Sequence, residues 1–284
     1  MLKNDLNGDG FADLVFQYYD SVNIANPLNG RLSAWFMNGA TLSVRTALTP
    51  NAPLNSTWEL DAIGDFDRDK KTDLVFKKTT ANVIRFWLMN GTKQSAVVTP
   101  APDVVTPHSI RAAADFDGDT KLDLVLQNST NGKVFIFRFG SVIGSGAARS
   151  IEYLGATEIT PPAGVGYPNP SIRVYGAADF NGDGRPDLAV QNKAASGATS
   201  VWYMGNTVGT GSASIPVPNQ ITVAADLVRG LDDMNGDGQL DLIIQNGAII
   251  SIKPRIGTTG FNFGPKQSFS PNSTGSIYTT IRNN

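Results

Sequence analysis

Five short segments of the chain carry oxygen-bearing side chains at the same four positions. They are DLNGDGFAD from Asp5, DFDRDKKTD from Asp65, DFDGDTKLD from Asp115, DFNGDGRPD from Asp179 and DMNGDGQLD from Asp233. Asp or Asn stands at positions 1, 3 and 5 of each segment, and Asp stands at position 9. A hard cation such as Ca²⁺ takes about six to eight oxygen ligands. The spacing therefore predicts a metal site in each segment.

We expect each loop to supply four side-chain ligands, and position 7 to add its backbone carbonyl oxygen. The predicted ligands are Asp5, Asn7, Asp9, Phe11 and Asp13; Asp65, Asp67, Asp69, Lys71 and Asp73; Asp115, Asp117, Asp119, Lys121 and Asp123; Asp179, Asn181, Asp183, Arg185 and Asp187; Asp233, Asn235, Asp237, Gln239 and Asp241. Mg²⁺ prefers a stricter octahedron with several waters, and softer metals prefer nitrogen or sulfur. We therefore predict about five Ca²⁺ ions, one in each loop.

The segments differ from the EF-hand, which opens in the same way but needs Glu at position 12 and a helix on both sides. Position 12 is apolar in all five segments: Phe16, Phe76, Leu126, Val190 and Ile244. The residues after position 9, such as LVFQ and LIIQ, favour a strand. The pattern thus predicts calcium loops within β-hairpins.

The loops differ at position 6, where a left-handed backbone suits glycine. Gly10, Gly184 and Gly238 stand there in the first, fourth and fifth loops, but Lys70 and Thr120 stand there in the second and third. The second and third loops carry four Asp each, and the extra negative charge can offset a less favourable backbone. Their calcium occupancy is left open.

The acidic residues are concentrated in these loops, which hold 17 of the 25 Asp and Glu of the chain. Like charges brought together by folding cost free energy unless a cation neutralises them. Five divalent ions, with two charges each, would change the formal net charge from −2 to +8.

The elements that position the loops also repeat, because the loop starts are 60, 50, 64 and 54 residues apart. Stretches such as WELDAIGDF and SIRAAADF precede a loop, and stretches such as VIRFWLMNG and TSVWYMGN follow it. Each unit therefore predicts four strands in about 55 residues, which is the size of one propeller blade.

The loops and their spacing resemble the FG-GAP/VCBS repeat family, which includes the propellers of integrin α-subunits and calcium-containing propeller lectins. The resemblance implies an all-β fold with calcium between the first two strands of each blade. We expect residues 1–284 to form one five-bladed β-propeller of four-stranded blades. Ser276 to Arg282 would complete the first blade and close the ring. The alternative is part of a seven-bladed propeller.

Three tryptophans fall at one register of the predicted third strand: Trp35, Trp87 and Trp202, with Phe137 in that place in the third unit. Large flat side chains can fill the wedge between radiating blades. The alternative is a set of platforms on which sugar rings stack, so these three residues are also candidate ligand-binding residues.

Other features of the sequence narrow the function. His108 is the only histidine and no nucleophile motif accompanies it, so we predict no enzymatic activity. The chain has no cysteine, which excludes disulfides and thiolate chemistry. No apolar run is long enough to span a membrane, and no secretion signal is visible at the N-terminus. Basic residues are scattered, which makes nucleic acid an unsuitable partner.

We therefore expect a secreted or cell-surface recognition module, since such loops fill at the calcium levels found outside cells. A glycan is the first candidate ligand, followed by a cell-surface protein in adhesion or a structural role within a larger surface protein. A polysaccharide-processing enzyme such as a lyase is the alternative from another class. The oligomeric state is left open.

Overall fold

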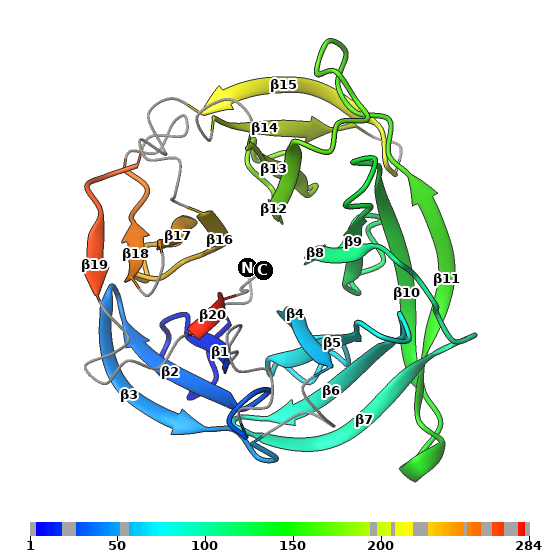
Figure 1. Cartoon of the computed structure of the whole chain (residues 1–284), viewed down its shortest axis with the longest axis vertical. Coiled ribbons are helices and arrows are strands. Elements are labelled where there is room, and N and C mark those ends of the chain that lie inside the picture. The colour runs from blue at the N-terminus through cyan, green and yellow to red at the C-terminus, as the bar shows by residue number, and fades with distance from the viewer. Residues whose placement is uncertain are drawn as a thin grey trace.

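The protein is an all-β ring of five blades around a central axis (Figure 1). The computed structural model describes residues 4–18, 27–51, 57–193, 198–205, 208–217, 227–246, 249–256, 263–269 and 278–281. In each blade the strands run antiparallel to their neighbours, from an innermost strand at the axis to an outermost strand at the rim. The predicted five-bladed propeller is confirmed.

Each blade has four strands, which follow one another from the axis outward. Blade 1 consists of β20 (Tyr278–Ile281), β1 (Leu14–Tyr18), β2 (Leu32–Asn38) and β3 (Thr41–Ala47). Blade 2 consists of β4 (Trp58–Gly64), β5 (Asp73–Lys78), β6 (Ile84–Asn90) and β7 (Lys93–Ala101). Blade 3 consists of β8 (Ser109–Ala114), β9 (Asp123–Gln127), β10 (Val134–Ile143) and β11 (Ser150–Glu158), with a 3₁₀ turn, η1 (Gly146–Ala148), before β11.

The last two blades have the same order of strands. Blade 4 consists of β12 (Ile172–Ala178), β13 (Asp187–Asn192), β14 (Thr199–Met204) and β15 (Gly211–Val217). Blade 5 consists of β16 (Leu227–Asp232), β17 (Asp241–Asn246), β18 (Ile249–Lys253) and β19 (Gln267–Phe269).

The ring is closed by strands from opposite ends of the described chain. β20 pairs antiparallel with β1, placing Ile281 opposite Phe16 and Thr280 opposite Gln17. This confirms the predicted closure for Tyr278–Ile281, whereas the rest of the segment predicted to close the ring lies outside the described residues. The alternative, part of a seven-bladed propeller, does not fit, because blades 1 and 5 share one apolar cluster and Asn4 bonds to Asp232 between them.

The hydrophobic core lies between the blades. The described residues form five buried apolar clusters, and each cluster draws its members from two neighbouring blades. A blade packed on both faces needs apolar side chains on both sides of its strands, and β9 (DLVLQ) is buried at all five positions. This explains why the stretches after the loops are continuous apolar runs instead of alternating patterns.

The innermost strands converge at the axis, where space is limited. Cβ added to Gly176 on β12 would lie 2.8 Å from Cδ1 of Leu231 on β16, in the next blade. Small residues therefore end several inner strands, as Ala113 and Ala114 do on β8.

At the rim, blades 2 and 3 are joined directly. β7 pairs parallel with β11, with Thr99 opposite Ser150 and Ala101 opposite Glu152, so the two blades form one eight-stranded sheet. This pairing covers two strand edges that would otherwise be open to association.

Candidate functional site

The predicted metal loops all lie at the same end of the ring. In blades 2 to 5 each loop connects the innermost strand to the second strand, and in blade 1 the loop leads directly into β1. The ends of β4, β8 and β12 that lead into their loops line one cavity together with Asn4, which precedes the first loop and bonds to Asp232 at the end of β16. The fold therefore arranges these acidic loops as a ring around a single axis.

The aspartate at position 9 links each loop to the third strand or the residues just after it. In blade 2, Asp73 Oδ2 accepts the N–H of Phe66 at 2.9 Å, and Oδ1 accepts the N–H of Met89 at 2.8 Å. The other four loops repeat both bonds: Asp13 with Leu6 and Met37, Asp123 with Phe116 and Phe139, Asp187 with Phe180 and Met204, and Asp241 with Met234 and Arg255. All five side chains are fully buried.

Burial makes these carboxylates hard to keep ionised without a cation. Desolvation raises the pKa of Asp73 to about 8 and that of Asp123 to about 7, and the neighbouring Asp carboxylates raise both further. Desolvation also raises the pKa of Asp13, Asp187 and Asp241 to about 6. The backbone hydrogen bonds oppose the shift, yet burial outweighs them. A divalent cation would neutralise such carboxylates at physiological pH.

The aspartate at position 1 shapes the loop itself. Its Oδ2 accepts the N–H of position 6 at 2.8 to 2.9 Å in all five loops, as Asp5 does from Gly10 and Asp65 from Lys70. The backbone at positions 4 and 6 is left-handed throughout. Glycine provides this conformation at all but three of these positions, which are Arg68 (φ 66°), Lys70 (φ 68°) and Thr120 (φ 71°). A left-handed backbone costs a residue with a side chain about 1–2 kcal/mol.

The second and third loops nevertheless bring their carboxylates together. One carboxylate oxygen each from Asp65, Asp67 and Asp73 lie within 4.8 Å of one another, and so do oxygens from Asp115, Asp117 and Asp123. Oxygens that close can share one cation at the usual Ca²⁺–oxygen distance of about 2.3–2.6 Å. These two triads can therefore hold a metal ion, despite Lys70 and Thr120.

The other three loops have Asn at position 3, and its side chain contacts position 5. The amide of Asn7 donates to Asp9 at 2.9 Å, that of Asn181 to Asp183 at 3.1 Å, and that of Asn235 to Asp237 at 3.0 Å. The predicted side-chain ligands of each loop thus lie within one compact turn, and all of them offer oxygen. This donor chemistry suits a hard cation.

A cavity of about 650 Å³ lies at the metal-loop end of the axis. The small and apolar ends of β4, β8 and β12 line it, together with the loops at 65–73, 115–123 and 179–187. Four cationic side chains also line it: Arg68, Lys70, Lys71 and Arg185. This volume falls within the range of about 300–1,000 Å³ that is typical of small-molecule sites.

The candidate sugar platforms are buried. Trp35, Trp87 and Trp202 are only 0, 3 and 1% exposed, and each belongs to an apolar cluster between two blades. Trp87 packs against Phe76 with ring centroids 4.7 Å apart. A stacking platform needs an exposed ring face, so this burial contradicts the stacking interpretation. The three indoles fill the wedge between blades.

His108 lies just before β8, at the end of that strand away from the metal loop. Its ring stacks on Phe135 with centroids 4.8 Å apart, and Nδ1 is 2.9 Å from the hydroxyl of Thr106. Burial, followed by the nearby charge of Lys77, lowers the pKa of His108. These surroundings are those of a packed, hydrogen-bonded side chain.

In blades 1, 2 and 3 the residue that follows the apolar run links neighbouring blades, a role that the repeat pattern alone did not predict. Gln17 on β1 donates to the carbonyl of Trp58 at 2.6 Å and accepts the N–H of Leu60 at 2.8 Å, both on β4. Gln127 on β9 bonds to β12 in the same way, and Lys77 donates to the carbonyl of His108. The recurrence of Gln after the apolar run was the available signal.

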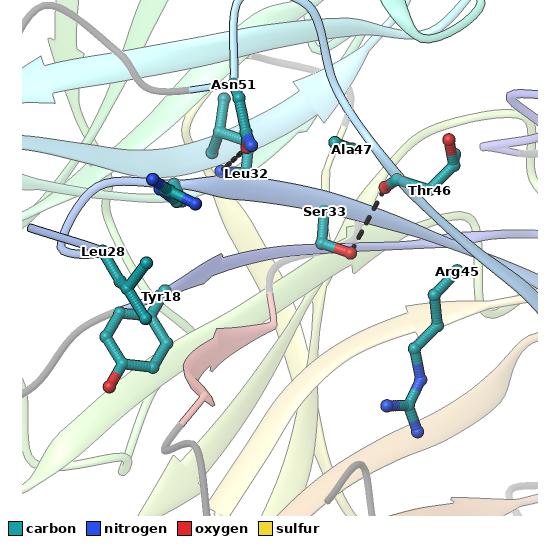
Figure 2. Close-up of a pocket in the computed structure, with 9 residues that line it drawn as sticks. Tyr18, Leu28, Leu32, Ser33, Arg45, Thr46, Ala47 and Asn51 are labelled. Carbon is teal, nitrogen blue, oxygen red and sulfur yellow. Dashed lines mark hydrogen bonds between the residues drawn. The ribbon is translucent and has the colours of Figure 1, made fainter. Parts of the chain in front are cut away.

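A second hollow, of about 310 Å³, lies on blade 1 (Figure 2). Tyr18, Arg45 and Asn51 line it, and the Ser33 hydroxyl donates to the Thr46 carbonyl at 3.3 Å. Residues 19–26 and 52–56, which adjoin this lining in the sequence, lie outside the described residues, so we assign no ligand to it.

Comparison with known proteins agrees with the repeat pattern. The profile of the FG-GAP-like repeat matches residues 65–126, 115–190 and 179–244. No curated protein matches the chain. Among solved structures, the chain is similar to a protein of unknown function from Bacteroides caccae, with 9% identity and a TM-score of 0.43, over 95% of this chain and 76% of that one. Among the described residues, no helix is long and apolar enough to cross a membrane.

Proposed function

Because this chain belongs to the FG-GAP-like repeat family, we propose that it is a calcium-stabilised recognition module that binds carbohydrate. The observation that carries the proposal is the cavity of about 650 Å³ whose walls are formed by three of the metal loops. A cavity with polar walls and a partly apolar floor suits a ligand that has hydroxyl groups and small apolar faces.

We assign the metal a structural role. The ions would be held by the oxygen ligands of the five loops, which include the two Asp triads of blades 2 and 3. When bound, Ca²⁺ supplies positive charge that neutralises the buried carboxylates. The chain's own contribution is to orient those carboxylates: the position-9 aspartate holds each loop against the third strand through two backbone N–H groups.

We further propose that the module is not catalytic. His108 lies at the end of β8 away from the metal loops, and its ring contacts Thr106 and Phe135 instead of the cavity. The carboxylates in the cavity wall, Asp65, Asp115 and Asp179, accept backbone N–H groups of their own loops. A polysaccharide-processing enzyme, such as a lyase, is the competing proposal.

Adhesion to a protein is the second candidate. The outermost strands of blades 1, 2 and 3 expose apolar side chains, with Val44 51%, Val97 42% and Leu154 47% exposed. Such residues could contact a partner at the rim. For either ligand we propose a secreted or cell-surface location, because loops of this kind fill at extracellular calcium levels.

A glycan array probed with the calcium-loaded protein tests the carbohydrate proposal. We expect binding to at least one class of glycan, and competition by the same sugar free in solution. An array without signal, together with a pull-down of a surface protein that survives excess sugar, would favour adhesion. Turnover of a polysaccharide that is lost in His108→Ala would favour the enzyme.

A further inference from the structure

The cavity at the metal-loop end has an unusual distribution of charge. Its three acidic residues, Asp65, Asp115 and Asp179, stand at position 1 of their loops. Each directs its Oδ2 to an N–H of its own loop, at 2.8 to 2.9 Å. Bound calcium would neutralise these carboxylates further. Against these three acids the cavity lining has four cationic residues, Arg68, Lys70, Lys71 and Arg185, of which Lys71 is paired with Asp69 at 3.3 Å.

Two of these cationic residues stand at positions whose left-handed backbone is unfavourable for a residue with a side chain. Arg68 and Lys70 stand at positions 4 and 6 of the second loop with φ of 66° and 68°, where the first, fourth and fifth loops have glycine. Both side chains are exposed, so burial in the core does not compensate for the strained backbone. Among the described residues neither forms an ion pair within 4.0 Å. Backbone strain that packing does not explain is found preferentially at binding sites.

We propose that the axial cavity binds an acidic oligosaccharide, one that carries carboxylate groups, and that Arg68 and Lys70 recognise those carboxylates. The inference rests on the proposed carbohydrate function and names the class of sugar. A guanidinium group can pair with a carboxylate through two parallel hydrogen bonds, and an ammonium group adds a mobile charge. Ile63 and Leu122, with the alanines that end β8 and β12, give the sugar rings an apolar floor.

The test compares two trisaccharides that differ only in the group at C6: cellotriose, which has hydroxymethyl groups there, and cellotriose oxidised at C6 to glucuronic acid, which has carboxylates. Titration calorimetry uses the calcium-loaded full chain with calcium in excess. We expect the oxidised trisaccharide to bind at least tenfold more tightly, with an affinity that falls as salt is added. Inorganic sulfate should compete only weakly. If sulfate displaced the oxidised trisaccharide at an equal concentration, the cavity would be a simple anion site, and the inference would be overturned.

The double variant Arg68→Gly/Lys70→Gly separates recognition from stability. It should lose at least tenfold in affinity for the oxidised trisaccharide, with a melting temperature equal to or above that of the parent protein, because glycine relieves the left-handed backbone. The matched control is Asn82→Gly, which relieves a left-handed backbone (φ 57°) outside the cavity wall without removing charge. Its affinity should not change.

Equal affinity of the parent protein for both trisaccharides, or an unchanged affinity in the double variant, would overturn the inference. Failure to bind either trisaccharide would also overturn it. A glycan array that shows only neutral ligands would leave the carbohydrate function standing and reject this inference alone. An array with no ligand at all would reject both.

Discussion

Asp73 Oδ1 accepts the backbone N–H of Met89 at 2.8 Å, which ties the metal loop of blade 2 to the end of its third strand. The other oxygen of the same carboxylate accepts the N–H of Phe66 at 2.9 Å. One fully buried side chain thus shapes the loop, joins two elements and points a negative charge at a predicted metal. Several expected outcomes depend on this relationship.

Removing calcium should lower the melting temperature sharply. Folding gathers the loop carboxylates, and an ion that binds only the folded state stabilises it by mass action. Differential scanning calorimetry of the metal-free protein, before and after addition of millimolar CaCl₂, measures the effect. Mg²⁺ at the same concentration is the control and should restore less stability, because it requires a stricter octahedron. Identical melting curves with and without calcium would contradict the metal assignment.

The stabilisation by calcium should grow as the pH rises from about 4 to 8. In the metal-free folded state burial raises the pKa of Asp73 to about 8 and that of Asp123 to about 7, whereas an unfolded Asp has a pKa of about 4. The folded state therefore holds these protons more tightly, and the metal-free protein loses stability as they dissociate with rising pH.

Calcium competes with the same protons, so the gap between the calcium-loaded and metal-free melting temperatures should widen across this range. Protein freed of metal by dialysis is compared at each pH, which avoids a chelator whose own affinity changes with pH. A gap that is constant from pH 5 to pH 8 would show that these carboxylates do not hold the metal.

Substitutions at positions 9 and 5 of a loop should differ in how the loss of stability depends on calcium. Asp73→Asn puts an amide group next to two backbone N–H donors, which can leave one of them without an acceptor, at a cost of about 1–3 kcal/mol. This loss should appear with and without calcium. Asp183→Ala changes a position-5 ligand whose hydrogen bonds from Asn181 and Arg185 are exposed to solvent, so most of its loss should appear only with calcium. Chemical denaturation of both variants under the two conditions checks the contrast, which would be refuted by equal calcium dependence.

Removing the closing strand should destroy the cooperative transition. Deletion of residues 278–284 takes away β20, the innermost strand of blade 1, and exposes the edge of β1. We expect aggregation in size-exclusion chromatography and a broad, early melting transition. A milder variant, Asn4→Ala, removes the 2.5 Å bond from the Asn4 amide to Asp232 that joins blades 1 and 5. A soluble truncated protein with the parent melting temperature would show that the ring does not depend on β20.

Trp87→Ala should reduce stability without reducing ligand affinity. The indole is 3% exposed and packs between blades 1 and 2, so its removal leaves a cavity that costs about 3–5 kcal/mol. Because a poorly folded variant would bind less, affinity is measured at a temperature where the circular dichroism spectrum matches that of the parent protein. Lost affinity with normal stability would restore the sugar platform.

The sequence by itself determined the repeat, the blade and the loop chemistry. Asp at position 9 and the Asp or Asn residues at positions 1, 3 and 5 recur at the same spacing in all five loops, and the apolar runs that follow predict strands. The sequence shows these features because they are local: a loop of nine residues contains most of its own hydrogen-bond partners. Even the left-handed backbone at Lys70 and Thr120 follows from the loop pattern.

Only the tertiary structure decided which side chains meet across blades. The pairing of Asn4 with Asp232 spans 228 positions, and Gln17 reaches Trp58 and Leu60 in the next blade, so neither contact has a signature within one repeat. The sequence also left open whether Trp35, Trp87 and Trp202 are buried or exposed, because an aromatic side chain at that register can face a neighbouring blade or solvent. The packing of neighbouring blades buries them, since the three indoles fill the space between the blades. The cavity is a property of the closed ring, since its walls come from three loops that are 50 and 64 residues apart.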